Sequence, residues 1–207
     1  LKITERKNLY DSLHRWNFWM KTERKTRREK GTEIKMEEWM KEPDCCTICP
    51  RECGVNRTTG NMGVCHADAQ MKIARAALHF WEEPCISGKE GSGAIFFSGC
   101  ALGCVFCQNM DISRGQTGKK VTEEQLALIC LNLQAQGANN INLVTAGQYL
   151  PAVAKALKLA REQGLEIPVV YNSSGYEKPE TLQLLDGLVD IYLPDMKYMD
   201  AELAKKY

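Results

Sequence analysis

From residue 94 to the last residue, short apolar runs alternate with segments of helical pattern. The runs that predict strands lie at 94–97, 140–145, 167–171 and 188–193, and the helical patterns lie at 122–137, 151–164, 178–187 and after Asp200. Strands that alternate with helices predict a parallel sheet with right-handed crossovers. Four such units build a curved sheet, whereas a closed eight-unit barrel needs about 250 residues. We therefore predict an α/β fold with a partial parallel (βα) barrel, truncated or part of a longer protein.

Two of the predicted helices have well-marked ends. Thr122 and Gln125 are spaced as a capping box, and Gly137 supplies a left-handed stop. Pro151 stands in the first turn of the next helix, and Gly164 stands at its end. These residues predict where the helices begin and end, and so where the connecting loops lie.

The sequence before residue 94 has a different character. Residues 1–42 are predicted to be a helical extension, because apolar side chains recur there at helical spacing. Residues 43–93 are rich in proline and glycine, which disfavours a packed core and favours a loop-rich segment organised by a metal. The predicted domains are therefore a helical extension over 1–42, a cysteine-rich metal-binding segment over 43–93, and a (βα) core over 94–207.

Charge and hydropathy argue against several classes of function. The formal net charge is +1, so no global field favours nucleic acid or a membrane surface. No apolar run approaches the roughly 20 residues of a membrane span, and the charged first residues lack the apolar core of a secretory signal. We therefore expect a cytoplasmic protein that binds neither nucleic acid nor membrane.

The chain holds 10 cysteines, and most of them fall into two tight groups. The first group is Cys45, Cys46, Cys49, Cys53 and Cys65, and the second group is Cys100, Cys104 and Cys107. Cysteines in a small secreted protein would predict a disulfide framework. Clustered thiols in a chain without a secretory signal instead indicate metal.

The second group has three alternatives to a cofactor-binding loop. A helix face of buried thiols is disfavoured because Gly99 and Gly103 lie within it, and each glycine costs about 1 kcal/mol inside a helix. Disulfides cannot pair three thiols, and structural zinc prefers four protein ligands. Three thiolates suit a four-iron cluster in which one iron stays open for a small molecule. The loop also follows the first predicted strand, at the sheet edge where parallel folds bind ligands.

The spacing C-x3-C-x2-C after this strand, with the aromatic Phe106 before the last cysteine, resembles the radical S-adenosylmethionine (SAM) superfamily. Four longer segments resemble its branch of pyruvate formate-lyase activating enzymes and their homologues. They are GSGAIFFSGCALGCVFCQN, VDIYLPDMKYMDAELAKKY, CTICPRECGVNRTTGNMGVC and LHFWEEPCISG. The resemblance covers about residues 45–207 and implies a barrel of the radical SAM type behind an N-terminal extension.

The resemblance implies a cofactor and a reaction. Cys100, Cys104 and Cys107 would hold a 4Fe-4S cluster whose open iron is chelated by the amino and carboxylate groups of SAM. One electron from the reduced cluster would break a carbon–sulfur bond and form a 5′-deoxyadenosyl radical, which takes a hydrogen atom from the substrate. The implied partners are SAM, an electron donor such as flavodoxin or ferredoxin, and a protein glycyl radical precursor as one candidate substrate.

The resemblance also implies cofactor-binding residues. Phe106 would lie beside the adenine, and the alternative is a plain core aromatic. The G-G-E segment that holds the methionine amino group in the family corresponds here to Ala146, Gly147 and Gln148. Gln148 keeps a hydrogen-bond acceptor but lacks the carboxylate charge. An ordinary strand-to-helix loop is the alternative for these three residues.

Two later strand ends complete the implied set. Asn172 and Ser174 belong to a segment that resembles the T-N-G type near the ribose or carboxylate. Asp195 and Lys197 resemble the D-x-K segment of the activating enzymes, and the alternative is an exposed ion pair. Polar side chains at the carboxyl ends of parallel strands usually face a ligand.

In the first group, Cys46, Cys49, Cys53 and Cys65 follow spacings of three, four and twelve. They predict either a tetrahedral zinc site or a second iron–sulfur cluster that relays electrons, and the spacing alone does not choose between them. Cys45 is an alternative ligand to Cys46, and free thiols are the alternative to any metal site.

The leading functional hypothesis is a radical SAM oxidoreductase that resembles the activating enzymes. The alternative is an iron–sulfur or zinc protein that binds metal or transfers electrons without cleaving SAM, and the altered segment at Gln148 favours it. A structural zinc protein is a third hypothesis. Cys130 lies on the apolar face of a predicted helix and is predicted to be a core residue.

Overall fold

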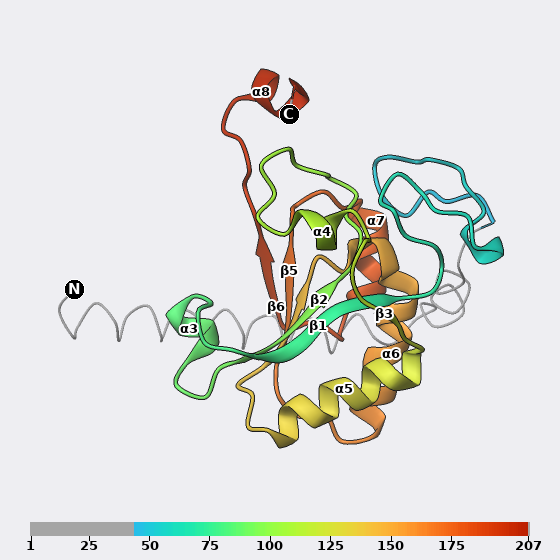
Figure 1. Ribbon diagram of the computed structural model, residues 1–207. Helices are drawn as coiled ribbons and strands as arrows, with labels where there is room; N and C mark the ends of the chain where they lie inside the picture. Colours follow the sequence, from blue (N-terminus) through green and yellow to red (C-terminus); the bar gives the residue numbers. More distant parts are fainter. Residues whose placement is uncertain (1–43, 207) are drawn as a thin grey trace, which may run out of the picture. The chain divides into compact units, whose positions relative to one another are not determined.

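The computed structural model describes residues 44–206, which belong to a compact unit that spans Trp39–Tyr207 (Figure 1). The predicted helical extension over 1–42 lies outside the described residues. The predicted boundary between residues 93 and 94 falls inside the compact unit. In the described part of the chain, no helix is long and apolar enough to cross a membrane.

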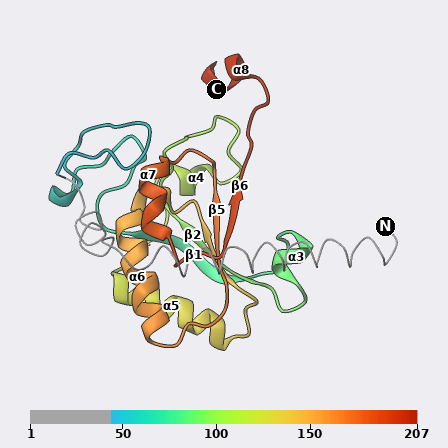
Figure 2. The same ribbon diagram turned by 180° about the vertical axis from the view of Figure 1, so that it is seen from behind.

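A six-stranded sheet forms the centre of this unit (Figures 1 and 2). In chain order its strands are β1 (Lys72–His79), β2 (Ser92–Phe97), β3 (Lys119–Lys120), β4 (Ile141–Val144), β5 (Val169–Ser173) and β6 (Ile191–Pro194). Their order in the sheet is β3-β1-β2-β4-β5-β6. β2, β4, β5 and β6 run parallel, whereas β1 pairs antiparallel with both β2 and β3. The four parallel strands confirm the predicted α/β fold, a partial (βα) barrel.

Helices connect the parallel strands. α5 (Glu123–Ala135) lies between β2 and β4 in the chain, and α6 (Leu150–Glu162) lies between β4 and β5. The shorter elements are α3 (Pro84–Ser87), α4 (Met110–Ser113), α7 (Pro179–Leu182), α8 (Ala201–Lys206) and the 3-10 turns η1 (Arg57–Thr59), η2 (Gly147–Tyr149) and η3 (Gln183–Leu185). α5, α6 and α7 lie on one side of the sheet (Figures 1 and 2), and a continuous apolar core fills the space between helices and strands.

The predicted helix ends are confirmed at α5 and α6. The Thr122 hydroxyl accepts a hydrogen bond from the Gln125 amide, and the Gln125 side chain accepts one from the Thr122 amide, which completes the capping box. Gly137 follows α5 with φ 89°, a left-handed conformation that suits glycine. Pro151 lies in the first turn of α6, and Gly164 follows its end with φ 100°.

β1 lies within the segment 43–93, where the sequence predicted loops. Its pairing with β2 shifts register between Ile73 and Arg75, so its side chains do not alternate regularly between a buried and an exposed face. A strand without that alternation gives little sequence signal. The predicted helix over 178–187 is also interrupted, because α7 ends at Leu182 and η3 follows it.

The parallel pairing brings the carboxyl ends of β2, β4, β5 and β6 to one edge of the sheet. Phe96 lies opposite Val144, Val144 lies opposite Asn172, and Asn172 lies opposite Leu193. The loops that leave these strands carry the second cysteine group and most of the other residues that the sequence singled out. Folds of this kind hold their ligands at this edge.

Candidate functional site

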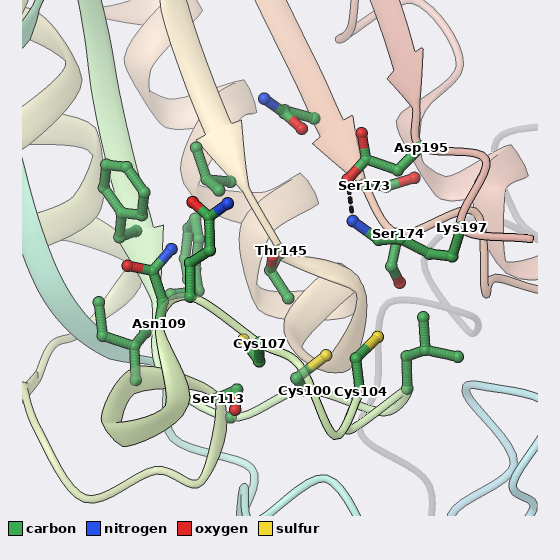
Figure 3. A pocket seen from close by; sticks show the side chains of 18 of the residues that line it. Cys100, Cys104, Cys107, Asn109, Ser113, Thr145, Ser173, Ser174, Asp195 and Lys197 are labelled. Carbon is green, nitrogen blue, oxygen red and sulfur yellow. Dashed lines mark hydrogen bonds and ion pairs between the residues drawn. The ribbon is translucent and has the colours of Figure 1, made fainter. Parts of the chain in front are cut away.

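The second cysteine group lies on the loop between β2 and α4. Gly99 (φ 87°) and Gly103 (φ 68°) have left-handed backbone conformations, so the segment is a turning loop and not a helix. Cys100, Cys104 and Cys107 are each partly exposed. Figure 3 shows all three side chains on this loop, at the edge where the parallel strands end.

These three cysteines line a cavity of about 380 Å³ (Figure 3). The ends of β2, β4 and β5, the segment after β6, the cysteine loop and α4 form its wall. The other predicted residues in the wall are Phe106, Asn172, Ser174, Asp195 and Lys197. A volume of this size is in the range of pockets that bind small organic ligands.

The thiols of the second group act on one another. Burial raises the pKa of the Cys104 thiol, and the neighbouring Cys100 and Cys107 raise it further, while Lys197 opposes the rise. Like charges that lie close together disfavour ionisation, and a bound cation reverses that effect because the thiolate is the form that ligates metal. The donor set of this loop therefore fits a cationic metal cofactor.

Lys197 faces the cysteine loop from the segment after β6. Its Nζ lies 2.5 Å from Asp195 Oδ2, and its side chain is 32% exposed. Burial acts to lower the pKa of Lys197, but the hydrogen bond and charge of Asp195, together with Cys104 and Cys107, outweigh it and raise the pKa above its ordinary value. The lysine is thus a charged group in the cavity wall, held beside two of the cysteines.

Thr145 is a cavity residue that the sequence did not single out. It follows β4 with φ 57°, a backbone conformation that is rare for a β-branched residue, and its amide donates to the Asn172 carbonyl at 2.9 Å. Other polar residues of the wall that sequence reasoning missed are Asn109 and Ser113. For Thr145 the available signal was a hydroxyl at the end of an apolar strand.

Phe106 stands at the cavity with 54% of its surface exposed. Its ring packs against the Tyr198 ring in a T-shaped contact, with the centroids 5.8 Å apart. Phe106 is therefore not a core aromatic, and about half of its surface is accessible to a ligand.

Gln148 does not reach the cavity wall, and neither do Ala146 and Gly147. The Gln148 side chain is buried within the fold, and the residue is only 2% exposed. Its Nε2 donates to three backbone carbonyls, those of Ser98 (3.1 Å), Gly99 (2.9 Å) and Thr145 (2.9 Å). The side chain thus ties the start of the cysteine loop to the end of β4, and the structure does not bring these three predicted residues to the cavity.

The four predicted ligands of the first group share one loop region. Cys46 and Cys65 are buried, and Cys49 and Cys53 are partly exposed. A Cβ atom at position 63 would lie 3.1 Å from Cys53 Sγ and 3.5 Å from Cys65 Sγ. The glycine at position 63 therefore leaves room for two thiols that approach each other from different turns.

Neither cysteine group forms a closed cage. Within residues 44–206, no three side chains of metal-ligating type lie close enough to enclose a single metal ion. Three thiols of one loop that line one cavity are a donor set that a four-iron cluster can use.

The chain is similar to two curated proteins. An uncharacterized protein of Methanocaldococcus jannaschii is 33% identical over 168 residues, which cover 78% of this chain and 48% of that protein. The pyruvate formate-lyase-activating enzyme of Clostridium pasteurianum is 30% identical over 111 residues, which cover 51% of this chain and 45% of that enzyme. The chain thus spans about half the length of these curated relatives. No solved structure matches it.

The family assignment comes from the core of the fold. Residues 94–207, more than half of the chain, match the Radical SAM superfamily. The matched residues include most of β2, the other three parallel strands, the cysteine loop and the cavity wall described above. The chain therefore belongs to the radical SAM superfamily.

Proposed function

We propose that this chain carries the cofactor site of an enzyme that cleaves SAM reductively and uses the resulting radical to abstract a hydrogen atom. One observation supports this proposal above all others: three thiols of a single loop line a cavity of about 380 Å³ at the carboxyl edge of four parallel strands. That edge is where such folds hold ligands. Three cysteines leave one coordination position of a cubane open, as catalytic metal sites require.

In this proposal Cys100, Cys104 and Cys107 hold a 4Fe-4S cluster. With the cluster bound and reduced, SAM would receive one electron at its sulfonium, and its carbon–sulfur bond would break to give a 5′-deoxyadenosyl radical. The protein's own part is to bind and orient the two molecules. Lys197 places a positive charge beside the anionic thiolates, and the loop buries part of each cysteine side chain.

In this proposal the polar side chains of the cavity wall bind SAM. Asn172 and Ser174 lie at and after the end of β5, where they can hydrogen-bond the ribose or the carboxylate of the methionine moiety. Asp195 is an acceptor for a hydroxyl or ammonium group. Phe106 offers a half-exposed ring and its backbone to the adenine. Each role remains a prediction for mutagenesis.

Anaerobic reconstitution tests the proposal. With iron, sulfide and a strong reductant, the purified protein is expected to turn brown and to release 5′-deoxyadenosine from SAM. Cys104→Ala should abolish product and the colour due to this cluster, while Cys85→Ser, an exposed cysteine outside both groups, should change neither. A protein that carries only zinc at the second group, or a Cys104→Ala variant with unchanged product, would contradict the proposal.

We further propose that the enzyme resembles activating enzymes in its type of reaction, with a protein glycyl radical precursor as the candidate substrate and a flavodoxin or ferredoxin as electron donor. The similarity to a pyruvate formate-lyase-activating enzyme supports this narrower assignment. Electron paramagnetic resonance of a candidate substrate mixed with the reduced protein and SAM should show a glycyl radical signal. Cleavage of SAM without such a signal would leave the general reaction in place and remove the narrower one.

A second candidate function is electron transfer without cleavage of SAM. The position of Gln148 favours it, because the residue that corresponds to the family's carboxylate is turned into the fold. An iron-loaded protein that is redox-active but releases no 5′-deoxyadenosine would support this function. The cytoplasmic location stays a prediction of the sequence.

A further inference from the structure

The first cysteine group lies outside the Radical SAM match, which begins at residue 94. Two backbone hydrogen bonds close the loop that begins at Cys46 and ends at Val55. The Gly54 amide donates to the Cys46 carbonyl at 3.1 Å, and the Cys46 amide donates to the Val55 carbonyl at 3.1 Å. Glu52 (φ 41°) and Gly54 (φ 68°) turn the chain through left-handed conformations. The backbone thus folds Cys46, Cys49 and Cys53 back on one another.

Backbone amides surround the sulfurs of this group. Backbone groups hydrogen-bond three of the sulfurs: Ile48 bonds Cys46, Val64 and Val55 bond Cys53, and Ala67 bonds Cys65. The Cys46 side chain also hydrogen-bonds Cys53, so these two sulfurs lie next to each other. Outer contacts of this kind hold and orient metal ligands.

The structure also separates Cys46 from its neighbour Cys45. Cys46 is buried and lies 4.0 Å from the guanidinium of Arg57, whereas Cys45 is exposed. Cys53 and Cys65 both border Gly63, as described above. The ligand set that the geometry favours is therefore the four-cysteine set without Cys45.

Three hydrogen bonds connect this group to the loop of the second group. The Cys100 amide donates to the Cys65 carbonyl at 3.0 Å. Arg51 donates from Nε to the Ala101 carbonyl at 2.9 Å and from a terminal nitrogen to the Leu102 carbonyl at 3.1 Å. Cys65, which belongs to the first group, and Arg51, which lies between Cys49 and Cys53, thus hold the backbone of the cofactor loop.

We propose that Cys46, Cys49, Cys53 and Cys65 form a second, four-thiolate metal centre that anchors residues 98–104, the first part of the cofactor loop between β2 and α4. Zinc and a second iron–sulfur cluster share this ligand chemistry. Among residues 44–206 no such side chains enclose a single ion, so metal binding requires the four sulfurs to move closer together. Four protein ligands leave no open position, so the role of the centre is structural or electron-relaying and not SAM binding.

The site is tested without SAM, in the full chain with Cys100→Ala, Cys104→Ala and Cys107→Ala combined. After anaerobic production with both metals supplied, this variant should retain one zinc, or iron and sulfide in the amounts of one cluster, per chain. Elemental analysis and acid-labile sulfide distinguish the two. Adding Cys49→Ala with Cys65→Ala should remove the metal, and adding Cys45→Ser should not. Absence of stoichiometric zinc and iron from the triple variant would overturn the proposal even if SAM cleavage is established.

A second measurement does not depend on metal retained during production: the triple variant is stripped of metal with a chelator and then titrated with cobalt(II). One equivalent should give thiolate-to-cobalt absorption, and Cys46→Ser should weaken it more than Cys45→Ser does. Equal loss in both variants would contradict the proposed ligand set.

The anchoring is tested by amide hydrogen exchange at residues 98–104, compared between protein with and without metal in the first cysteine group. Removal of the metal from the first group should speed exchange of the Cys100 amide about tenfold, as loss of a hydrogen bond worth about 1.4 kcal/mol predicts. Arg51→Ala should speed exchange in the same segment while the metal stays bound. Arg75→Ala, an exposed arginine on β1, is the matched control. Unchanged exchange after metal removal and in Arg51→Ala would disprove the anchoring.

Discussion

Gln148 is a residue whose side chain bonds the protein backbone, although the family resemblance predicts that it contacts the ligand. The family resemblance assigns its position to the methionine amino group, yet its side-chain amide donates to three backbone carbonyls around the cysteine loop. A carbonyl left without a donor in a buried place costs about 1–3 kcal/mol. The amide is therefore better used as an internal clamp than as a ligand contact.

Gln148→Glu separates these two roles. In the clamp role, the carboxylate would face three carbonyl oxygens without a proton to donate, and the variant should lose at least about 3 kcal/mol of unfolding free energy. In the ligand role, the same change restores the charge of the family's carboxylate and should tighten SAM binding. Urea unfolding and SAM titration measure the two. A variant as stable as the wild type would contradict the clamp.

Cys130 predicts a pH dependence of stability. Burial raises the pKa of this thiol from its ordinary value of 9.0 to about 12. Between these values the unfolded chain releases the proton and the folded chain keeps it, so the free energy of unfolding falls as pH rises. The slope is about 1.4 kcal/mol per pH unit for this one group. Between pH 9 and 10.5, the free energy of unfolding should fall less steeply with pH in Cys130→Ala than in the wild type. Denaturant titrations at several pH values measure this, and an equal slope in both proteins would refute it.

Among the elements, α5 illustrates a boundary that depends on local chemistry alone. The capping box of Thr122 and Gln125 provides hydrogen-bond acceptors for two backbone amides at the start of α5. It can be recognised from four consecutive residues of the sequence. Thr122→Ala should lower the unfolding free energy by about 1 kcal/mol, because one amide loses its acceptor. Thr122→Ser should restore most of it. Because α5 lies away from the cavity wall, the SAM affinity of the alanine variant should equal that of the wild type.

β1 illustrates the opposite case, an element that depends on its partner. Its register shift next to Arg75 breaks the alternation by which strands are recognised, and pairing with β2 supplies the order that the local sequence lacks. The same reason explains why the direction of Gln148 and the backbone of Thr145 escaped prediction. Both are set by contacts with segments far away in the sequence.

At the scale of the molecule, Arg57 joins the cysteine-rich segment to the barrel core. It is 1% exposed, donates to the Gln148 carbonyl at 2.6 Å and to the Asp68 carbonyl, and lies over the Tyr149 ring at 5.8 Å. Arg57→Met removes both donors and should cost about 2–5 kcal/mol. Unfolding of the wild type, followed by far-UV circular dichroism and by near-UV absorbance, should show one common transition. Two separate transitions in the wild type would contradict this coupling.

Much of the fold could be predicted from the sequence because its signals are local. The four strands of the parallel sheet, the caps of α5 and α6, and the three cysteines of the cofactor loop follow from periodicity and spacing. The joining of the two cysteine groups could not be predicted, because a hydrogen bond such as that from Cys100 to Cys65 connects main-chain atoms and leaves no trace in residue types. Arg51 was likewise an ordinary surface cation until its partners were known.

The bond between the Cys100 amide and the Cys65 carbonyl has a consequence for survival in air. Iron–sulfur chemistry is lost to oxygen, and in many proteins the emptied site then unravels. Here that bond and the hydrogen bonds of Arg51 hold the cysteine loop from outside the proposed cluster. We expect iron lost from the proposed cluster to leave the loop in place as long as the first cysteine group keeps its metal, so that fresh iron, sulfide and electrons rebuild the cluster without refolding.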